Sequence, residues 1–133
     1  MSGDTKKRCL EKNSEDAIKW AAENDLTVLF PKDNQLFLDI DTNEDRDVFN
    51  RNRELVDEVY GIVDVQERSS RSKGHVHLIV TLRESITPLG RIALQAILGS
   101  DRRREAHSLR RLEDGEARPT LFFEKPIEPD HLL

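Results

Sequence analysis

LFLDID at residues 36–41 and HVHLIVTL at residues 75–82 are the two clearest strand patterns in the chain. Residues i and i+2 of a strand share a face, so each stretch has one apolar row and one row that carries polar groups. The apolar rows are Leu36, Leu38 and Ile40 in the first stretch and Val76, Leu78, Val80 and Leu82 in the second. The opposite rows contain Asp39 and Asp41 in the first stretch and His75 and His77 in the second. If both apolar rows pack on the same helices, two carboxylates and two imidazoles meet on the other face of one sheet.

Helix and strand signals alternate through the rest of the chain. Capping residues and apolar stripes predict helices over about 15–24, 43–60, 88–98 and 102–112. Alternation and turn residues predict strands over 26–30, 35–41, 62–68, 75–82 and 120–124, with 26–41 forming a hairpin around the turn at 31–34. This order predicts an α+β domain with an RRM-like or palm-like sheet, mixed or antiparallel. Helices are expected on one face of that sheet, and the other face is expected to be open.

Length and composition indicate one domain. The chain has 133 residues, with 36% hydrophobic and 35% charged residues. We expect a flexible N-terminal segment at 1–12, a single domain at 13–124 and an extended, proline-containing tail at 125–133. The single cysteine, Cys9, excludes an intrachain disulfide, and no apolar run approaches the ~18 residues of a membrane span. These features predict a soluble, cytoplasmic protein without a membrane partner.

Charge is unevenly distributed along the chain. The net charge of −5 argues against a generally cationic nucleic-acid binder. Residues 39–67 contain ten acidic residues against three arginines, whereas residues 68–73 and 100–111 each carry a net charge of +3. Basic segments that flank an acidic site would suit a polyanion held near metal ions.

The polar rows have a functional and a structural interpretation. Asp39 and Asp41 can hold Mg²⁺ or Mn²⁺ together with substrate phosphates, although aspartate is also common where a strand leads into a helix cap. His75 and His77 can supply two metal ligands, or one ligand and one phosphate contact. Two half-exposed histidines on a solvated face are the alternative.

Other candidate residues surround these rows. Ser70, Arg71, Ser72 and Lys73, followed by Gly74, could bind phosphate or form a solvated hairpin loop. Glu124 could complete a carboxylate set or end an exposed strand. Arginines 102–104 could contact a nucleic-acid backbone, but pairing of Arg102 with Glu105 would make them a solvated helix face. Tyr60 and Trp20 are expected to pack, and Cys9 has no assigned role.

The chain resembles the catalytic core of archaeo-eukaryotic-type primases and primase-polymerases, as a small phage- or plasmid-type relative. LFLDID at 36–41 resembles the acidic D-x-D strand of that family, and SRSKGHVH at 70–77 resembles its basic loop that runs into a histidine. The resemblance implies a metal-dependent nucleotidyltransferase in DNA replication or repair, with Asp39, Asp41 and Glu124 as metal ligands. It implies that His77 or His75 contacts the phosphates of a nucleoside triphosphate. The implied partners are single-stranded or primer-template nucleic acid and a replication protein.

Two further interpretations remain open. His75-Val76-His77 is similar to the His-hydrophobe-His motif of HUH endonucleases, in which the histidines hold a metal and a tyrosine attacks a phosphodiester. That tyrosine normally follows the motif, whereas Tyr60 precedes it. The domain could instead be a non-catalytic RRM-like binding or adaptor module, which would stack bases on Phe37 and Phe122 of the open face.

Overall fold

The structure is a computed structural model that describes residues 14–69 and 75–124. Its elements are α2 (Ser14–Glu23), β1 (Thr27–Leu29), β2 (Gln35–Ile40), α3 (Asn43–Tyr60), β3 (Ile62–Ser69), β4 (Val76–Leu82), α4 (Pro88–Ile97), α5 (Arg102–Glu113) and β5 (Phe122–Glu124). The predicted α+β class is confirmed. Cys9, Arg71, Ser72, Lys73 and the two predicted terminal segments lie outside the described residues.

Helix boundaries follow local capping chemistry. The Thr42 hydroxyl accepts a hydrogen bond from the Asp45 amide at 3.1 Å, and the Thr87 hydroxyl accepts one from the Gly90 amide at 3.0 Å. These bonds satisfy amides that have no partner inside the first turn of α3 and of α4. Within residues 14–69 and 75–124, no helix is long and apolar enough to cross a membrane.

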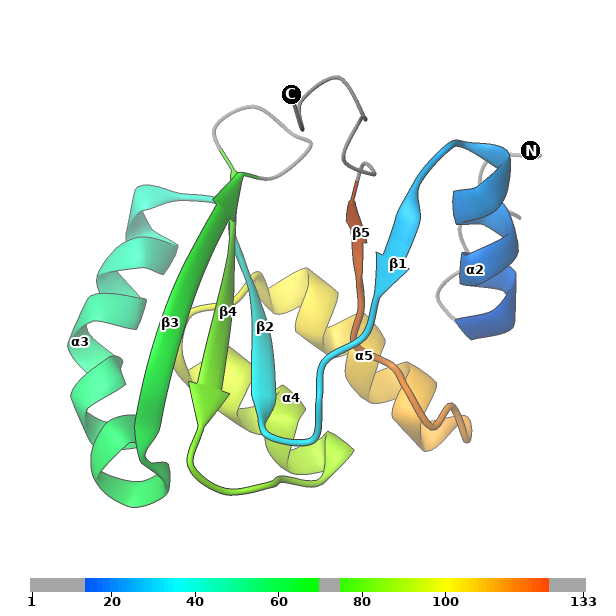
Figure 1. Ribbon diagram of the computed structural model, residues 1–133. Helices are drawn as coiled ribbons and strands as arrows, with labels where there is room; N and C mark the ends of the chain where they lie inside the picture. Colours follow the sequence, from blue (N-terminus) through cyan, green and yellow to red (C-terminus); the bar gives the residue numbers. More distant parts are fainter. Residues whose placement is uncertain (1–13, 70–74, 125–133) are drawn as a thin grey trace, which may run out of the picture.

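The strands form two antiparallel sheets. One sheet has three strands in the order β2-β4-β3, and the other pairs β1 with β5 (Figure 1). The predicted 26–41 hairpin is therefore wrong, because β1 pairs with β5 through Val28 and Phe123. Strand β2 has no free edge for β1. Its inner edge pairs with β4, and backbone groups on its outer edge are bonded by side chains of α4, α5 and the turn between them.

The main core lies between the three-stranded sheet and two helices. The predicted apolar rows of β2 and β4 are buried there against α3 and α4, through residues that include Phe49, Val56, Leu94 and Leu98. The prediction that helices cover this face is confirmed. Helix α5 lies beside α4, and α2 lies outside β1 (Figure 1).

The opposite face is not open, which corrects the second part of that prediction. Phe37 and Ile79 on this face are buried together with Phe122 of β5, so the two-stranded sheet covers part of it. The physical cause is that the polar rows of β2 and β4 also contain Phe37 and Ile79. These two large apolar side chains are stabilised when another element shields them from water. Asp39 and Asp41 remain partly accessible toward the end of β2, and Asp64 and Gln66 of β3 are exposed on the same face.

Candidate metal centre

One row of side chains crosses the three-stranded sheet. Asp39 of β2 is the register partner of His77 of β4, and His77 is the partner of Arg68 of β3. Because directly opposed residues point to the same face, these three side chains share the face that β5 partly covers. The row places a carboxylate, an imidazole and a guanidinium side by side.

The predicted carboxylates and imidazoles meet at one end of this row. His75 Nδ1 lies 2.7 Å from Asp41 Oδ1, and His77 Nε2 lies 3.9 Å from Asp39 Oδ1. Ligand atoms of Asp39, Asp41 and His75 all lie within 4.8 Å of one another. We call these three residues the Asp-Asp-His cluster. Two carboxylate oxygens and one imidazole nitrogen form a donor set that suits a divalent cation such as Mn²⁺.

Burial gives Asp39 an unusual proton affinity. The pKa of Asp39 is raised to about 7; desolvation by burial is the largest cause, the Arg104 guanidinium lowers the pKa, and nearby Asp41 contributes to the rise. Two close carboxylates repel each other when both are ionised, so one of them keeps a proton near neutral pH. A bound cation would remove this repulsion.

The backbone of Asp39 is held by the segment that joins α4 to α5. The Asp39 amide donates to Ser100 Oγ at 3.0 Å, and the Asp101 amide donates to the Asp39 carbonyl at 2.8 Å. Ser100 donates in turn to buried Glu105 at 2.7 Å. These bonds fix the backbone position of Asp39, from which its side chain extends.

Glu105 has a different role from the one that the sequence suggested. It accepts hydrogen bonds from Gln95 at 2.7 Å and from Arg104 at 2.8 Å, and its side chain is buried. The predicted exposed pair with Arg102 is therefore wrong, because Glu105 faces inward and compensates Arg104. Arg104 also donates to the Phe37 carbonyl on the outer edge of β2. This network was not predicted from the sequence, because a glutamate in the first turn of an arginine-rich helix is usually exposed and only weakly indicates a buried role.

An aromatic stack and an ion pair connect the row to β5. The Phe122 ring is stacked on Phe37 at 4.4 Å and on His77 at 3.8 Å between ring centroids. Phe37 and Phe122 are therefore buried against each other and do not present the open base-stacking surface considered above. Glu124 receives two hydrogen bonds from Arg68, at 2.7 and 2.8 Å, and lies outside the Asp-Asp-His cluster.

Tyr60 is placed far from the histidines. It ends α3 and packs against the core on the helix side of the sheet. It also precedes Ile62, which pairs with Leu82 at the end of β4 opposite to His75. The described residues thus bring no tyrosine to the two histidines, and the HUH interpretation lacks its nucleophile here.

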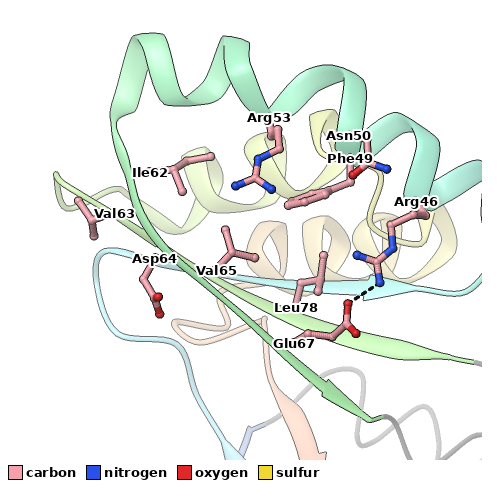
Figure 2. Close-up of a pocket in the computed structure, with 10 residues that line it drawn as sticks. All are labelled: Arg46, Phe49, Asn50, Arg53, Ile62, Val63, Asp64, Val65, Glu67 and Leu78. Atoms are coloured by element: carbon pink, nitrogen blue, oxygen red, sulfur yellow. Dashed lines mark hydrogen bonds and ion pairs between the residues drawn. The ribbon is translucent and has the colours of Figure 1, made fainter.

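A separate hollow lies on the helix side of the sheet. It has a volume of about 560 Å³ and lies between α3 and the edge strand β3. Arg46 and Arg53 reach into it from α3, and Glu67 of β3 pairs with Arg46 (Figure 2). Asp39 is on the opposite face of the sheet, so this hollow is not part of the candidate metal centre.

Comparison with known proteins gives no relative. No family model, curated protein or solved structure matches the chain.

Proposed function

We propose that this protein is a metal-dependent nucleotidyl-transfer or nucleic-acid-processing protein that resembles a minimal primase-polymerase core and acts in DNA replication or repair. The observation that carries the proposal is the convergence of Asp39, Asp41 and His75 ligand atoms within 4.8 Å. Asp39 lies in β2 and Asp41 directly follows it, whereas His75 directly precedes β4 and lies more than 30 positions further along the chain, so the fold itself brings them together.

The cluster would hold Mg²⁺ or Mn²⁺ as its cofactor. Such a cation supplies charge neutralisation at a phosphate and orients the attacking oxygen. Asp39 and Asp41 would bind it through carboxylate oxygens and His75 through a ring nitrogen. Metal binding would require Asp39 to release the proton that burial favours, so we expect affinity to rise with pH up to about 7.

The substrate side of the proposal rests on neighbouring residues. His77 lies next to Asp39 on the same face and would contact a phosphate of a nucleoside triphosphate. Arg71 and Lys73, with Ser72 between them, precede His75 in the sequence and would add charge for the triphosphate and for single-stranded or primer-template nucleic acid. Glu124 is bonded to Arg68, so the third carboxylate role needs this ion pair to open.

A Mn²⁺ titration monitored by electron paramagnetic resonance tests the metal site. We expect the double variant Asp39→Asn, Asp41→Asn to bind Mn²⁺ at least tenfold more weakly than the wild type, because both anionic ligands are lost. Asp64→Asn is the matched control, since Asp64 is an exposed carboxylate on β3 outside the cluster. Unchanged Mn²⁺ affinity in the folded double variant would contradict the site.

A primer-extension assay tests the reaction. With Mn²⁺, a primer-template and nucleoside triphosphates, the wild type should extend the primer and the double variant should not. The protein could bind metal without a stronger response to nucleoside triphosphate and without extending the primer. That result would indicate a metal-binding module and contradict the nucleotidyl-transfer proposal. Absence of metal binding as well would favour a non-catalytic adaptor.

A further inference from the structure

A second site lies at the beginning of β2, at the end of this strand opposite to the Asp-Asp-His cluster. It is a cavity of about 140 Å³. Arg91, which lines it, donates from Nε to the Gln35 carbonyl at 2.8 Å, and Gln35 is the first residue of β2. At about 3.3 Å per residue, Gln35 lies about 13 Å from Asp39 and about 20 Å from Asp41 along the strand direction. The residues that line the cavity include none of the Asp-Asp-His cluster.

Three distant segments form the walls of the cavity, and hydrogen bonds hold them in place. The turn after β1 is bonded to α4, because Arg91 Nη2 donates to the Lys32 carbonyl at 2.8 Å. The Ile86 amide donates to the Asp33 carbonyl at 2.9 Å and fixes the segment before α4. Arg111 Nε donates to the Pro119 carbonyl at 3.2 Å and fixes the segment before β5. The cavity is thus preformed.

The wall also contains a buried hydroxyl group for which the described residues supply no partner. Thr120 is 2% exposed, and its Oγ1 makes no hydrogen bond within the described part of the chain. Thr120 lines the cavity. Buried hydroxyl groups are nearly always hydrogen-bonded, so a polar occupant of the adjoining cavity would supply the partner that this one lacks among the described residues.

The charged groups of the lining favour an anion. Two arginines, Arg91 and Arg118, and one aspartate, Asp33, line the cavity, so the charges of the lining residues sum to +1. Arg91 is buried, and desolvation lowers its pKa, so an additional anion beside it would offset the cost of burying its charge. The Arg118 guanidinium carbon lies 4.0 Å from the centroid of the Phe30 ring, which orients this second cation at the wall.

We propose that this cavity binds a small oxyanion, the phosphate or carboxylate group of a compact molecule, through Arg91, Arg118 and Thr120. Planar guanidinium groups bind both phosphate and carboxylate by paired hydrogen bonds, and the Thr120 hydroxyl supplies a further donor. The remaining walls include Phe30, Pro31 and Pro88 and are apolar. A volume of 140 Å³ equals that of about four or five liquid waters, so it admits only a small ligand.

Amide NMR titration of the full chain at pH 7 tests the proposal, with inorganic phosphate and acetate as probes and with sodium chloride exchanged to keep the ionic strength constant. We expect saturable shifts at the amides of Asp33, Arg91 and Thr120, without shifts at Asp39 and Asp41. A response to phosphate alone or to acetate alone would support the site and identify the group that it prefers.

Two variants and one matched control make the test specific. Arg118→Gln should weaken binding at least tenfold, and because Arg118 is exposed this variant should fold. Thr120→Val should weaken binding severalfold, since it removes the hydroxyl and keeps the shape. Arg103→Gln removes an exposed arginine of α5 outside the cavity and should bind as the wild type does.

Two results would overturn the proposal. Absence of saturable shifts with either probe would mean that the cavity holds only water. Equal weakening by Arg118→Gln and Arg103→Gln would mean that the anions bind the basic surface without a specific site. Neither result bears on the Asp-Asp-His cluster, because the cavity and the cluster share no residues.

Discussion

At the residue scale, Asp39 carries the most information about this protein. Its backbone is fixed by Ser100 and Asp101, while its side chain lies beside a second carboxylate and an imidazole. An aspartate that served only to form a turn would be most stable with its carboxylate exposed to water. Asp39 is instead desolvated enough for its pKa to rise to about 7, which is a pattern that functional sites often show.

The raised pKa predicts how stability depends on pH. Between the unfolded value of 3.8 and the folded value of about 7, the folded protein keeps a proton that the unfolded chain has released. The contribution of Asp39 to stability is therefore greatest below pH 4 and is lost as the pH rises to 7. About three pKa units correspond to about 4 kcal/mol, and we expect about half of this because the site is partly exposed.

Asp39→Asn tests this dependence, because asparagine cannot ionise. As the pH rises from 4 to 8, the wild type should lose about 2 kcal/mol in free energy of unfolding that the variant does not lose. Urea denaturation without divalent metal measures the difference, and Asp64→Asn should follow the wild type. Parallel pH curves for Asp39→Asn and the wild type would contradict a raised pKa.

At the element scale, the turn between α4 and α5 positions the groups that hold β2. Gly99 adopts φ +87° in this turn, a conformation that side chains other than glycine rarely adopt. A Cβ at this position would lie 2.5 Å from the Asp45 carbonyl oxygen and 3.0 Å from Val48 Cβ. The close approach of α3 to this turn therefore requires glycine, and Ser100 and Asp101 follow directly.

Gly99→Ala should lower the free energy of unfolding by about 3 kcal/mol or more, through left-handed strain of about 1–2 kcal/mol and the clash with α3. Gly115→Ala is the matched control, since Gly115 has φ +98° but a Cβ there would meet no atom within 4 Å. It should cost only about 1–2 kcal/mol. Thermal or urea denaturation gives both values, and equal losses would show that α3 does not crowd Gly99.

At the scale of the whole molecule, two small sheets are joined through aromatic packing. Phe122 contacts Phe37 and His77 of the three-stranded sheet, and neighbouring Phe123 contacts Trp20 of α2 at 5.2 Å between ring centroids. A two-stranded sheet is marginally stable alone, so the β1–β5 pair depends on this packing.

Phe122→Ala should therefore lower the free energy of unfolding by about 3–5 kcal/mol, because it leaves a cavity between the two sheets. Hydrogen exchange should accelerate at Val28 of β1 more than at Val80 of β4. Phe123→Ala should cost less, since Phe123 is only half-buried. Exchange that accelerates equally in both sheets would show that they unfold together.

The sequence by itself determined the elements and the polar rows. Thr42, Thr87 and Pro88 act through hydrogen bonds and dihedral angles within one turn, so the helices that follow them could be predicted from local sequence. The alternation at 36–41 and 75–82 placed Asp39, Asp41, His75 and His77 on one face, because strand periodicity does not depend on the partner.

Only the tertiary structure decided which edges pair and which faces are covered. The sequence could not show that β1 pairs with β5, because strand pairing depends on which edge remains free, and side chains of α4 and α5 and the turn between them occupy the outer edge of β2. Nor could it show that Phe122 covers Phe37, or that Thr120 and Arg91 line one cavity. These contacts join residues that lie far apart in the chain, and their energies arise from burial and charge compensation that no local pattern encodes.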